Sequence, residues 1–257
     1  MRCGTAGFEY DGRVSDSLVV NEIYISLQGE SSFAGLPCVF IRLTGCDLRC
    51  SWCDTAYAFN EGEKMTMDEV LANVIELAAP YQTDAWNQRL PLVEVTGGEP
   101  LLQRAAPELM RRLCDNGFTV LVETSGAHDV TGLDLRVRRI MDLKCPGSGE
   151  CERNHWENLS DLRETDEIKF VIASREDYEW MKRVIEENNL ARLCPLLCSW
   201  VAPLQDHQQD KSLKPPSENA TAITRAELAE AIAADALPVR FQLQMHKYIW
   251  PPDERGV

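Results

Sequence analysis

The chain has 257 residues, 44% of them hydrophobic and 26% charged, which are the proportions of an ordinary globular protein. This length favours one large domain or two small ones. The 26 Lys and Arg residues are outnumbered by 41 Asp and Glu residues, and the net charge of −15 argues against a protein that coats DNA or RNA. A small anionic ligand remains compatible with this charge, because a pocket can oppose the field of the whole molecule.

The sequence contains no run that approaches the roughly 20 apolar residues of a membrane helix. Residues 1–10 lack the apolar stretch of a secretory signal. The chain has ten cysteines, but a secreted disulfide scaffold is normally far shorter than 257 residues. We therefore expect a cytoplasmic protein with free or metal-bound thiols and without a membrane or nucleic-acid partner.

The hydrophobic pattern alternates strands with helices. In chain order it predicts a strand at 18–27, a turn at 29–35, a strand at 37–43, a helix at 67–79, a strand at 92–95, a helix at 103–116, strands at 118–122, 139–143 and 167–172, helices at 175–188 and 225–234, and a strand at 239–243. Thr66 and Glu69 form the pattern of a capping box at the first helix. Gly117 is the residue expected just after the end of the second helix.

Apolar strands separated by helices indicate βαβ units and a parallel sheet covered by helices. Six or more such strands predict an α/β fold, a full or partial (β/α) barrel in a single domain over 1–257. The stretches 145–164 and 205–221 have the composition of loops, and 205–257 is expected to form a C-terminal loop and closing segment. In such barrels the loops after the strands carry the chemistry.

Three cysteines, Cys46, Cys50 and Cys53, follow a predicted strand with the spacing C-x3-C-x2-C. A structural zinc ion and a fully ligated four-iron cluster each take four protein ligands. Three thiolates on one loop therefore leave one iron of a cluster open to an outside ligand. The alternative is a zinc-stabilised binding module in which Cys38 or a distant cysteine supplies the fourth ligand.

A second motif, Gly97-Gly98-Glu99-Pro100, stands at the end of a predicted strand. Its glycines allow the backbone to approach a ligand closely, and its carboxylate can accept hydrogen bonds from an ammonium group. By itself the motif is a common turn. Together with the cysteine triplet it resembles the radical S-adenosylmethionine (SAM) superfamily. That resemblance implies a partial barrel of the radical SAM type, with a [4Fe-4S] cluster that binds SAM at its open iron and cleaves it to methionine and a 5′-deoxyadenosyl radical.

Further motifs narrow the resemblance and cover most of the chain. In order, they are Asn21-Glu22-Ile23, Ser26-Leu27-Gln28-Gly29-Glu30, Gly35-Leu36-Pro37, residues 40–46, Glu123-Thr124-Ser125-Gly126, residues 142–149 and residues 244–251. This set is similar to the 7-carboxy-7-deazaguanine synthase family. The resemblance implies conversion of 6-carboxy-5,6,7,8-tetrahydropterin to 7-carboxy-7-deazaguanine, with hydrogen abstraction from C6, ring contraction and loss of ammonia. It also implies Mg²⁺, a homodimer, and an electron donor of the flavodoxin or ferredoxin type.

The same resemblance assigns roles to individual residues. The cluster ligands are Cys46, Cys50 and Cys53, and Thr55 holds Mg²⁺. The substrate is contacted by Leu27, Gln28, Gly29, Arg42 and Thr96. SAM is contacted by Ser51, Trp52, Gly98, Glu99, Ser125, Lys144 and Pro146. No side chain is assigned as a catalytic group, because the radical comes from SAM at the cluster.

The residues themselves leave several alternatives open. Arg42 lies in an apolar run and needs an anionic partner if it is buried, but it could instead face outward. Thr55 could be a helix N-cap. His246 and Lys247 could face the pocket, or be a packed histidine and a solvated lysine.

Two wider alternatives concern function. One is a glycyl-radical-enzyme activase, which has the same cluster but takes a protein backbone as substrate. The other is a second cluster or a zinc ion held by Cys145, Cys151, Cys194 and Cys198. The stretch 205–221 has the character of an insertion, and its role does not follow from the sequence.

Overall fold

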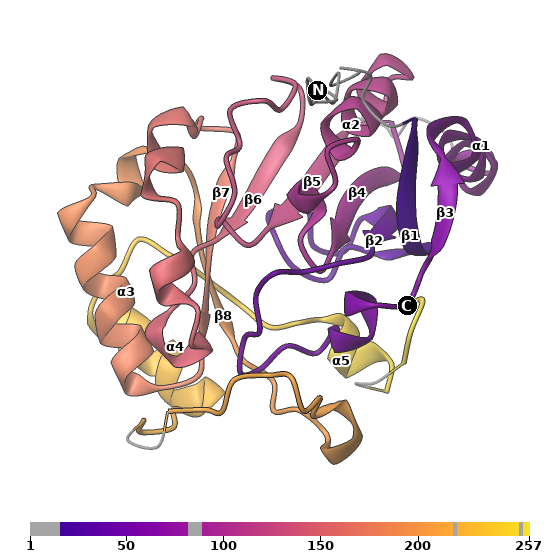
Figure 1. Ribbon diagram of the computed structural model, residues 1–257. Helices are drawn as coiled ribbons and strands as arrows, with labels where there is room; N and C mark the ends of the chain where they lie inside the picture. The colour runs from indigo at the N-terminus through magenta and orange to yellow at the C-terminus, as the bar shows by residue number, and fades with distance from the viewer. Residues whose placement is uncertain (1–15, 82–88, 218–219, 252–253) are drawn as a thin grey trace, which may run out of the picture.

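A computed structural model describes residues 16–81, 89–217, 220–251 and 254–257. The predictions for residues 1–10 and for parts of the C-terminal loop and tail lie outside this described part. The centre of the fold is a nine-stranded sheet in the order β3-β1-β2-β4-β5-β6-β7-β8-β9 (Figure 1). The pairs β1–β2 and β1–β3 are antiparallel, and all the other neighbouring pairs are parallel.

The strands are β1 (Ser17–Leu27), β2 (Pro37–Leu43), β3 (Glu63–Thr66), β4 (Leu92–Gly97), β5 (Val120–Thr124), β6 (Arg138–Asp142), β7 (Glu167–Ile172), β8 (Leu196–Trp200) and β9 (Arg240–Gln242). The helices are α1 (Met67–Ala78), α2 (Ala106–Asp115), α3 (Arg175–Glu187), α4 (Arg225–Ala234) and α5 (His246–Ile249). The predicted class, a mostly parallel sheet with helices outside, is confirmed. The single-domain boundary at 1–257 stays a prediction.

The local predictions differ from the structure in a few places. Strands β3 and β8 and helix α5 were not predicted, and α2 begins at Ala106 rather than at 103. Gln103 is outside the helix because its side chain pairs with the Val19 backbone and donates to the Thr44 carbonyl at 2.9 Å. The predicted loop at 145–164 contains three short 3₁₀ helices, η3 (Pro146–Ser148), η4 (Cys151–Arg153) and η5 (Trp156–Asp161).

The outer face of the sheet packs on the helices in two clusters. In the first, Val39, Ile41 and Leu43 of β2 pack with residues of β4, β5, α1 and α2. In the second, β6, β7 and β8 pack with α3 and α4. The capping box predicted at Thr66 and Glu69 is present at the start of α1. No helix in the described ranges is both long enough and apolar enough to cross a bilayer.

A buried charge cluster ties β6 to the start of β7. Asp166 is fully buried and receives hydrogen bonds from Arg139 Nε at 3.0 Å and from the guanidinium of Arg163. Burial alone would raise the pKa of Asp166, but the hydrogen bonds from the two arginines hold it below its usual value. The charge of Arg139, itself buried, is therefore compensated only while Asp166 is ionised.

We expect Asp166→Asn to lower the free energy of unfolding by about 3–5 kcal/mol at neutral pH, because it leaves Arg139 without its counter-charge. The pKa of Asp166 is lowered in the folded state, so its stabilisation is present above the unfolded pKa of about 3.9 and is lost as the pH falls through the folded pKa. The difference in the free energy of unfolding between the wild type and Asp166→Asn, measured by urea denaturation, should therefore become smaller below about pH 4. Asp134→Asn, in the partly exposed Asp134–Arg136 pair, should change stability by about 1 kcal/mol or less. Equal effects of the two substitutions would contradict this account.

Candidate active site

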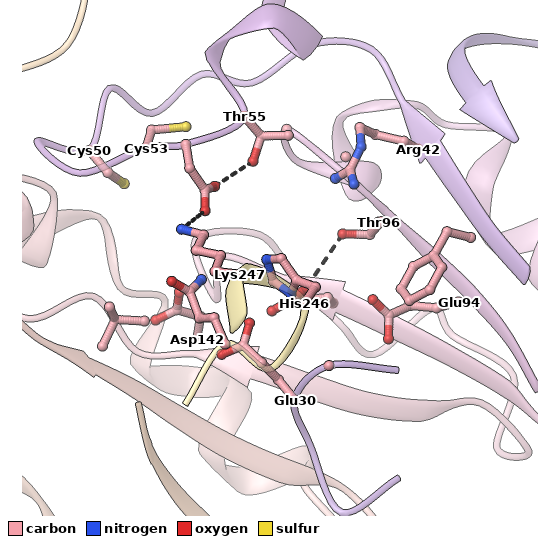
Figure 2. A pocket seen from close by; sticks show the side chains of 18 of the residues that line it. Glu30, Arg42, Cys50, Cys53, Thr55, Glu94, Thr96, Asp142, His246 and Lys247 are labelled. Atoms are coloured by element: carbon pink, nitrogen blue, oxygen red, sulfur yellow. Dashed lines mark hydrogen bonds and ion pairs between the residues drawn. The ribbon is translucent and has the colours of Figure 1, made fainter. Parts of the chain in front are cut away.

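A cavity of about 260 Å³ opens at the carboxyl ends of the parallel strands. Its lining comes from the β1–β2 turn, the loop after β2, the ends of β4 to β7 and the C-terminal segment. Figure 2 shows Cys50 and Cys53 on one side of this space, and Glu30 and Glu94 on the other. The carboxyl end of a parallel sheet is where α/β proteins commonly bind ligands.

The inner face of the sheet changes from apolar to polar along the strands. Near the amino ends it carries the apolar cluster Cys38, Phe40, Leu92, Leu121, Ile140 and Leu197. Two residues further along four of these strands stand the cavity residues Arg42, Glu94, Glu123 and Asp142, with Lys169 on β7 beside them. The corresponding residue of β8 is the buried Ser199. Because side chains two apart share a face, the same strands form an apolar layer and, above it, the charged floor of the cavity.

The cysteine loop follows β2, and Cys46, Cys50 and Cys53 all line the cavity. Their role as cluster ligands stays a prediction. Burial raises the pKa of Cys46 to about 11 and that of Cys53 to about 12. Burial thus favours the thiol form, while an iron–sulfur cluster takes the thiolate, so a binding cluster would displace protons. Three soft sulfur donors on one loop fit a cubane with one open iron.

A single-ion zinc site is a poorer fit to the same residues. Structural zinc needs four ligands around one ion. In the part of the chain that the structure describes, no three His, Cys, Asp or Glu side chains are grouped closely enough to hold one metal ion. Each cysteine that holds a cubane binds a different iron, so its ligands need not converge on one point.

The two glycines after β4 bring that strand against the cysteine loop. Gly98 N donates to Leu43 O at 3.3 Å, and Glu99 N donates to Gly45 O at 2.8 Å. Gly97 has φ +146°, and a Cβ on it would lie 2.1 Å from Leu43 O. A Cβ on Gly98 would lie 2.3 Å from Gly45 O. The sequence predicted that these glycines let the backbone approach a ligand. In the structure they let it approach the end of β2 and the start of the cysteine loop.

The residues predicted to contact SAM divide into two groups. Those that line the cavity are Trp52, Gly98, Ser125 and Lys144, while Ser51, Glu99 and Pro146 are outside its described lining. Glu99 is fully buried and accepts hydrogen bonds from Ser125 N at 2.7 Å and Thr124 Oγ1 at 2.9 Å. Its contact with SAM stays a prediction.

One buried carboxylate oxygen near Lys144 has no hydrogen-bond partner among the residues that the structure describes. Lys144 Nζ pairs with Asp142 Oδ2 at 2.6 Å. Asp142 Oδ1 is buried at the cavity and has no hydrogen-bond partner among the described residues. A buried acceptor of this kind is suited to a ligand donor such as a hydroxyl or an ammonium group, which fits a nucleoside cofactor.

Arg42 lines the cavity but already has an anionic partner. Its Nε donates to Glu22 Oε1 at 2.7 Å, and its Nη2 donates to Tyr24 Oη at 2.9 Å. Glu22 stands directly opposite Arg42 in the β1–β2 register and also accepts from Tyr57 Oη at 3.0 Å. The burial of Arg42 therefore does not by itself require a carboxylate ligand, and the outward-facing alternative is wrong.

The predicted substrate residues Leu27, Gln28, Gly29 and Thr96 all line the cavity. Gln28 is buried, donates to Glu94 and accepts from Glu30 N at 2.8 Å. A Cβ on Gly29 would lie 2.7 Å from His246 Nδ1, so α5 packs closely over the β1–β2 turn and a larger residue would displace the His246 side chain.

The same cavity contains a network of buried charges that was not predicted from the sequence. Lys169 bonds Glu123 and lies 3.5 Å from Glu30, which also accepts from Ser199 Oγ at 3.0 Å. Burial, with the nearby charge of Glu123, raises the pKa of Glu94 well above its usual value. Although burial opposes it, the Lys169 ammonium lowers the pKa of Glu123. The available signal was a charged residue inside each of several apolar strands, the same signal that identified Arg42.

The C-terminal segment contacts the cysteine loop directly (Figure 2). Lys247 Nζ pairs with Asp54 Oδ2 at 2.5 Å, and the Lys247 side chain is only 8% exposed, so the solvated alternative is wrong. Although burial opposes it, Lys247 holds the pKa of Asp54 below its usual value. Thr55 precedes a short 3₁₀ helix, yet its hydroxyl donates to Asp54 Oδ1 at 2.8 Å and makes no cap hydrogen bond.

The chain is similar to known proteins over most of its length. The Radical SAM superfamily matches residues 40–146, from β2 to the loop after β6. The 7-carboxy-7-deazaguanine synthase of Koribacter versatilis is 41% identical over 93% of this chain and 99% of its own length. That of Chlorobaculum tepidum is 42% identical over 93% of this chain and 97% of its own. The chain belongs to the 7-carboxy-7-deazaguanine synthase family. It is thus a radical SAM lyase, of a family with a [4Fe-4S] cluster and SAM as cofactors and a need for a reductant.

Solved structures agree on the fold. QueE from Escherichia coli superposes with a TM-score of 0.65 at 22% identity, covering 90% of this chain and 95% of that chain. SuiB from Streptococcus suis gives a TM-score of 0.53 at 12% identity, covering 78% of this chain and 47% of that one. At these identities the likeness supports the fold alone.

The remaining cysteines are not grouped around a single metal ion in the described part of the chain. Cys145, Cys194 and Cys198 are buried and Cys151 is half-buried, and all four are free thiols. None of them belongs to a group of metal-ligating side chains among the residues described. A zinc ion at these four cysteines therefore lacks support among the described residues, and a second cluster stays an untested alternative.

We expect Gly98→Ala to impair cluster assembly, because the new methyl group would meet the Gly45 carbonyl and push the cysteine loop away from β4. Iron and labile sulfide after anaerobic reconstitution should fall to less than half of the wild-type content. Gly132→Ala is the control, since an added Cβ at Gly132 meets nothing within 4 Å. A wild-type cluster content in Gly98→Ala would refute the packing argument.

Proposed function

We propose that this chain converts 6-carboxy-5,6,7,8-tetrahydropterin to 7-carboxy-7-deazaguanine with release of ammonia. The observation that carries the proposal is identity of 41–42% over 93% of the chain to synthases of this name. The cavity agrees with it, because the cysteine loop and a set of charged side chains face each other across a space of small-molecule size.

Cluster and SAM, when bound, supply the radical that abstracts hydrogen from C6 of the substrate. The chain's own part is to hold and orient these groups. Cys46, Cys50 and Cys53 would ligate the cluster. Trp52, Gly98, Ser125 and Lys144 would line the adjoining SAM site, which their position in the cavity lining supports.

The polar floor suits a pterin. The pyrimidine edge of a pterin carries N–H donors, and Gln28, Glu94 and Glu123 offer amide and carboxylate oxygens beneath the cavity. Arg42 would bind the substrate carboxylate from the other side, where a guanidinium can form paired hydrogen bonds. Thr96, between the two groups, would contact the ring.

We propose that Mg²⁺ binds at Thr55, whose hydroxyl and the neighbouring Asp54 carboxylate are the hard oxygen ligands this ion prefers. Lys247 already neutralises Asp54, so the ion would have to share or replace that contact. A homodimer, a flavodoxin- or ferredoxin-type electron donor and a cytoplasmic location complete the proposal. Free thiols in the described part are consistent with a reducing compartment.

The direct test is anaerobic reconstitution followed by assay with the carboxytetrahydropterin, SAM, Mg²⁺ and a reductant. We expect a brown protein with about four iron atoms per chain. We also expect formation of the deazaguanine and ammonia, lost on chelation of the iron. SAM cleavage without deazaguanine, together with radical formation on a protein substrate, would favour an activase. A colourless protein that contains zinc would exclude both the synthase and the activase function.

We expect Arg42→Lys to raise the KM for the pterin about 30-fold, which corresponds to about 2 kcal/mol for lost charge-assisted hydrogen bonds. A lysine keeps the positive charge near Glu22 but cannot form the paired hydrogen bonds of a guanidinium. The EPR signal of the reduced cluster and the affinity for SAM should stay as in the wild type. Arg192→Lys, at an exposed position, is the control. Loss of the cluster signal in Arg42→Lys would show that the residue supports the cysteine loop instead.

A further inference from the structure

The stretch that the sequence marked as an insertion contacts the cysteine loop. Residues 205–217 lead away from β8, and the backbone N of Lys214 donates to the carbonyl oxygen of Arg49 at 2.9 Å. Arg49 lies between two of the three cluster cysteines, Cys46 and Cys50. In Figure 1 this orange segment runs beneath the indigo loop that follows β2. We call residues 205–217 the strap.

The other backbone group of Arg49 is held from a third loop. Arg49 N donates to Glu150 Oε1 at 2.6 Å, and Glu150 is 4% exposed. The second carboxylate oxygen of Glu150 lies 2.9 Å from Lys214 Nζ. Lys214 therefore holds the backbone of Arg49 in two ways. Its own backbone N–H donates to the Arg49 carbonyl, and its ammonium group neutralises the carboxylate that accepts from Arg49 N. A buried carboxylate without this counter-charge would be strongly disfavoured.

The surroundings are shaped for this contact. Gly149 has φ +74°, and a Cβ on it would lie 2.8 Å from Lys214 Cδ, so the glycine leaves room for the lysine stem. Lys214 Nζ also donates to the Gly149 carbonyl. Arg49 turns its side chain back into the loop, donating to Cys46 O at 2.7 Å and stacking 4.2 Å from the Phe59 ring. The segment between Cys46 and Cys50 is thus fixed through both its backbone and its side chain.

We propose that the strap holds the cluster-binding loop in place from outside the cavity, with Lys214 and Glu150 as its positioning residues. The proposal rests on the cluster that the proposed function requires. Gly98 and Glu99 secure the start of the loop against β4, and the strap secures the stretch between its first two cysteines. The edge of the cluster is then held at a fixed distance from the strap. Its electrostatic environment is also fixed, because the charges of Lys214 and Glu150 are paired.

The test compares Lys214→Met, which keeps the stem and removes the charge, with Lys211→Met on the same strap. Lys211 is exposed, as Lys214 is, and replacing it with methionine removes the same charge from the strap. Reconstituted, iron-loaded proteins are mixed with a chelator under anaerobic conditions. Iron should be released about tenfold faster from Lys214→Met, while Lys211→Met should behave as the wild type. Lys214→Arg should restore most of the retention.

A second readout separates positioning from a general loss of stability. Removing the Lys214 charge should lower the reduction potential of the cluster, because a nearby negative charge is left unpaired. Glu150→Gln should raise it, since the positive charge is then the unpaired one. The EPR spectrum of the reduced cluster should change in both variants. Iron release, potential and EPR spectra equal to the wild type in both variants would overturn the proposal. A wild-type protein that takes up no cluster would instead refute the proposed function.

Discussion

The architecture of the site depends on a backbone contact that only glycine permits. Gly97 and Gly98 bring the end of β4 against Leu43 and Gly45, where any Cβ would overlap a carbonyl oxygen. This contact fixes the start of the cysteine loop relative to the sheet. The loop then has a defined position above the inner face of the barrel, and the three thiols face the same cavity as the charged residues of the strands.

The second constraint is the cost of burying charge. Glu30, Glu94, Glu123 and Lys169 lie on the floor of the cavity, where carboxylates outnumber ammonium groups. The resulting pKa shifts run in opposite directions, raised for Glu94 and lowered for Glu123, because only Glu123 contacts the Lys169 ammonium. Glu94 therefore ionises less readily than Glu123, although both carboxyl groups lie in the same cavity.

Segments distant in the sequence complete the enclosure. Lys247 pairs with Asp54 beside the third cysteine, and Arg255 pairs with Glu61 and stacks 3.7 Å from the Tyr57 ring. The strap contributes Lys214 on the other side of the loop. Each of these is a cation placed on an acidic or carbonyl-rich surface, so a chain with net charge −15 uses local positive charge to hold its cofactor loop.

The sequence by itself determined the fold class and indicated the three cysteines proposed as cluster ligands, because strand and helix periodicity and the spacing of Cys46, Cys50 and Cys53 are local properties of the chain. It also indicated Arg42, through a charge in an apolar strand. Only the tertiary structure decided which charges meet. The contacts of Lys169 with Glu123 and Glu30 and of Lys214 with Glu150 join residues on separate strands and loops, and depend on sheet register and loop path rather than on spacing. The same applies to Glu22, which stands opposite Arg42 only because β1 and β2 pair in that register.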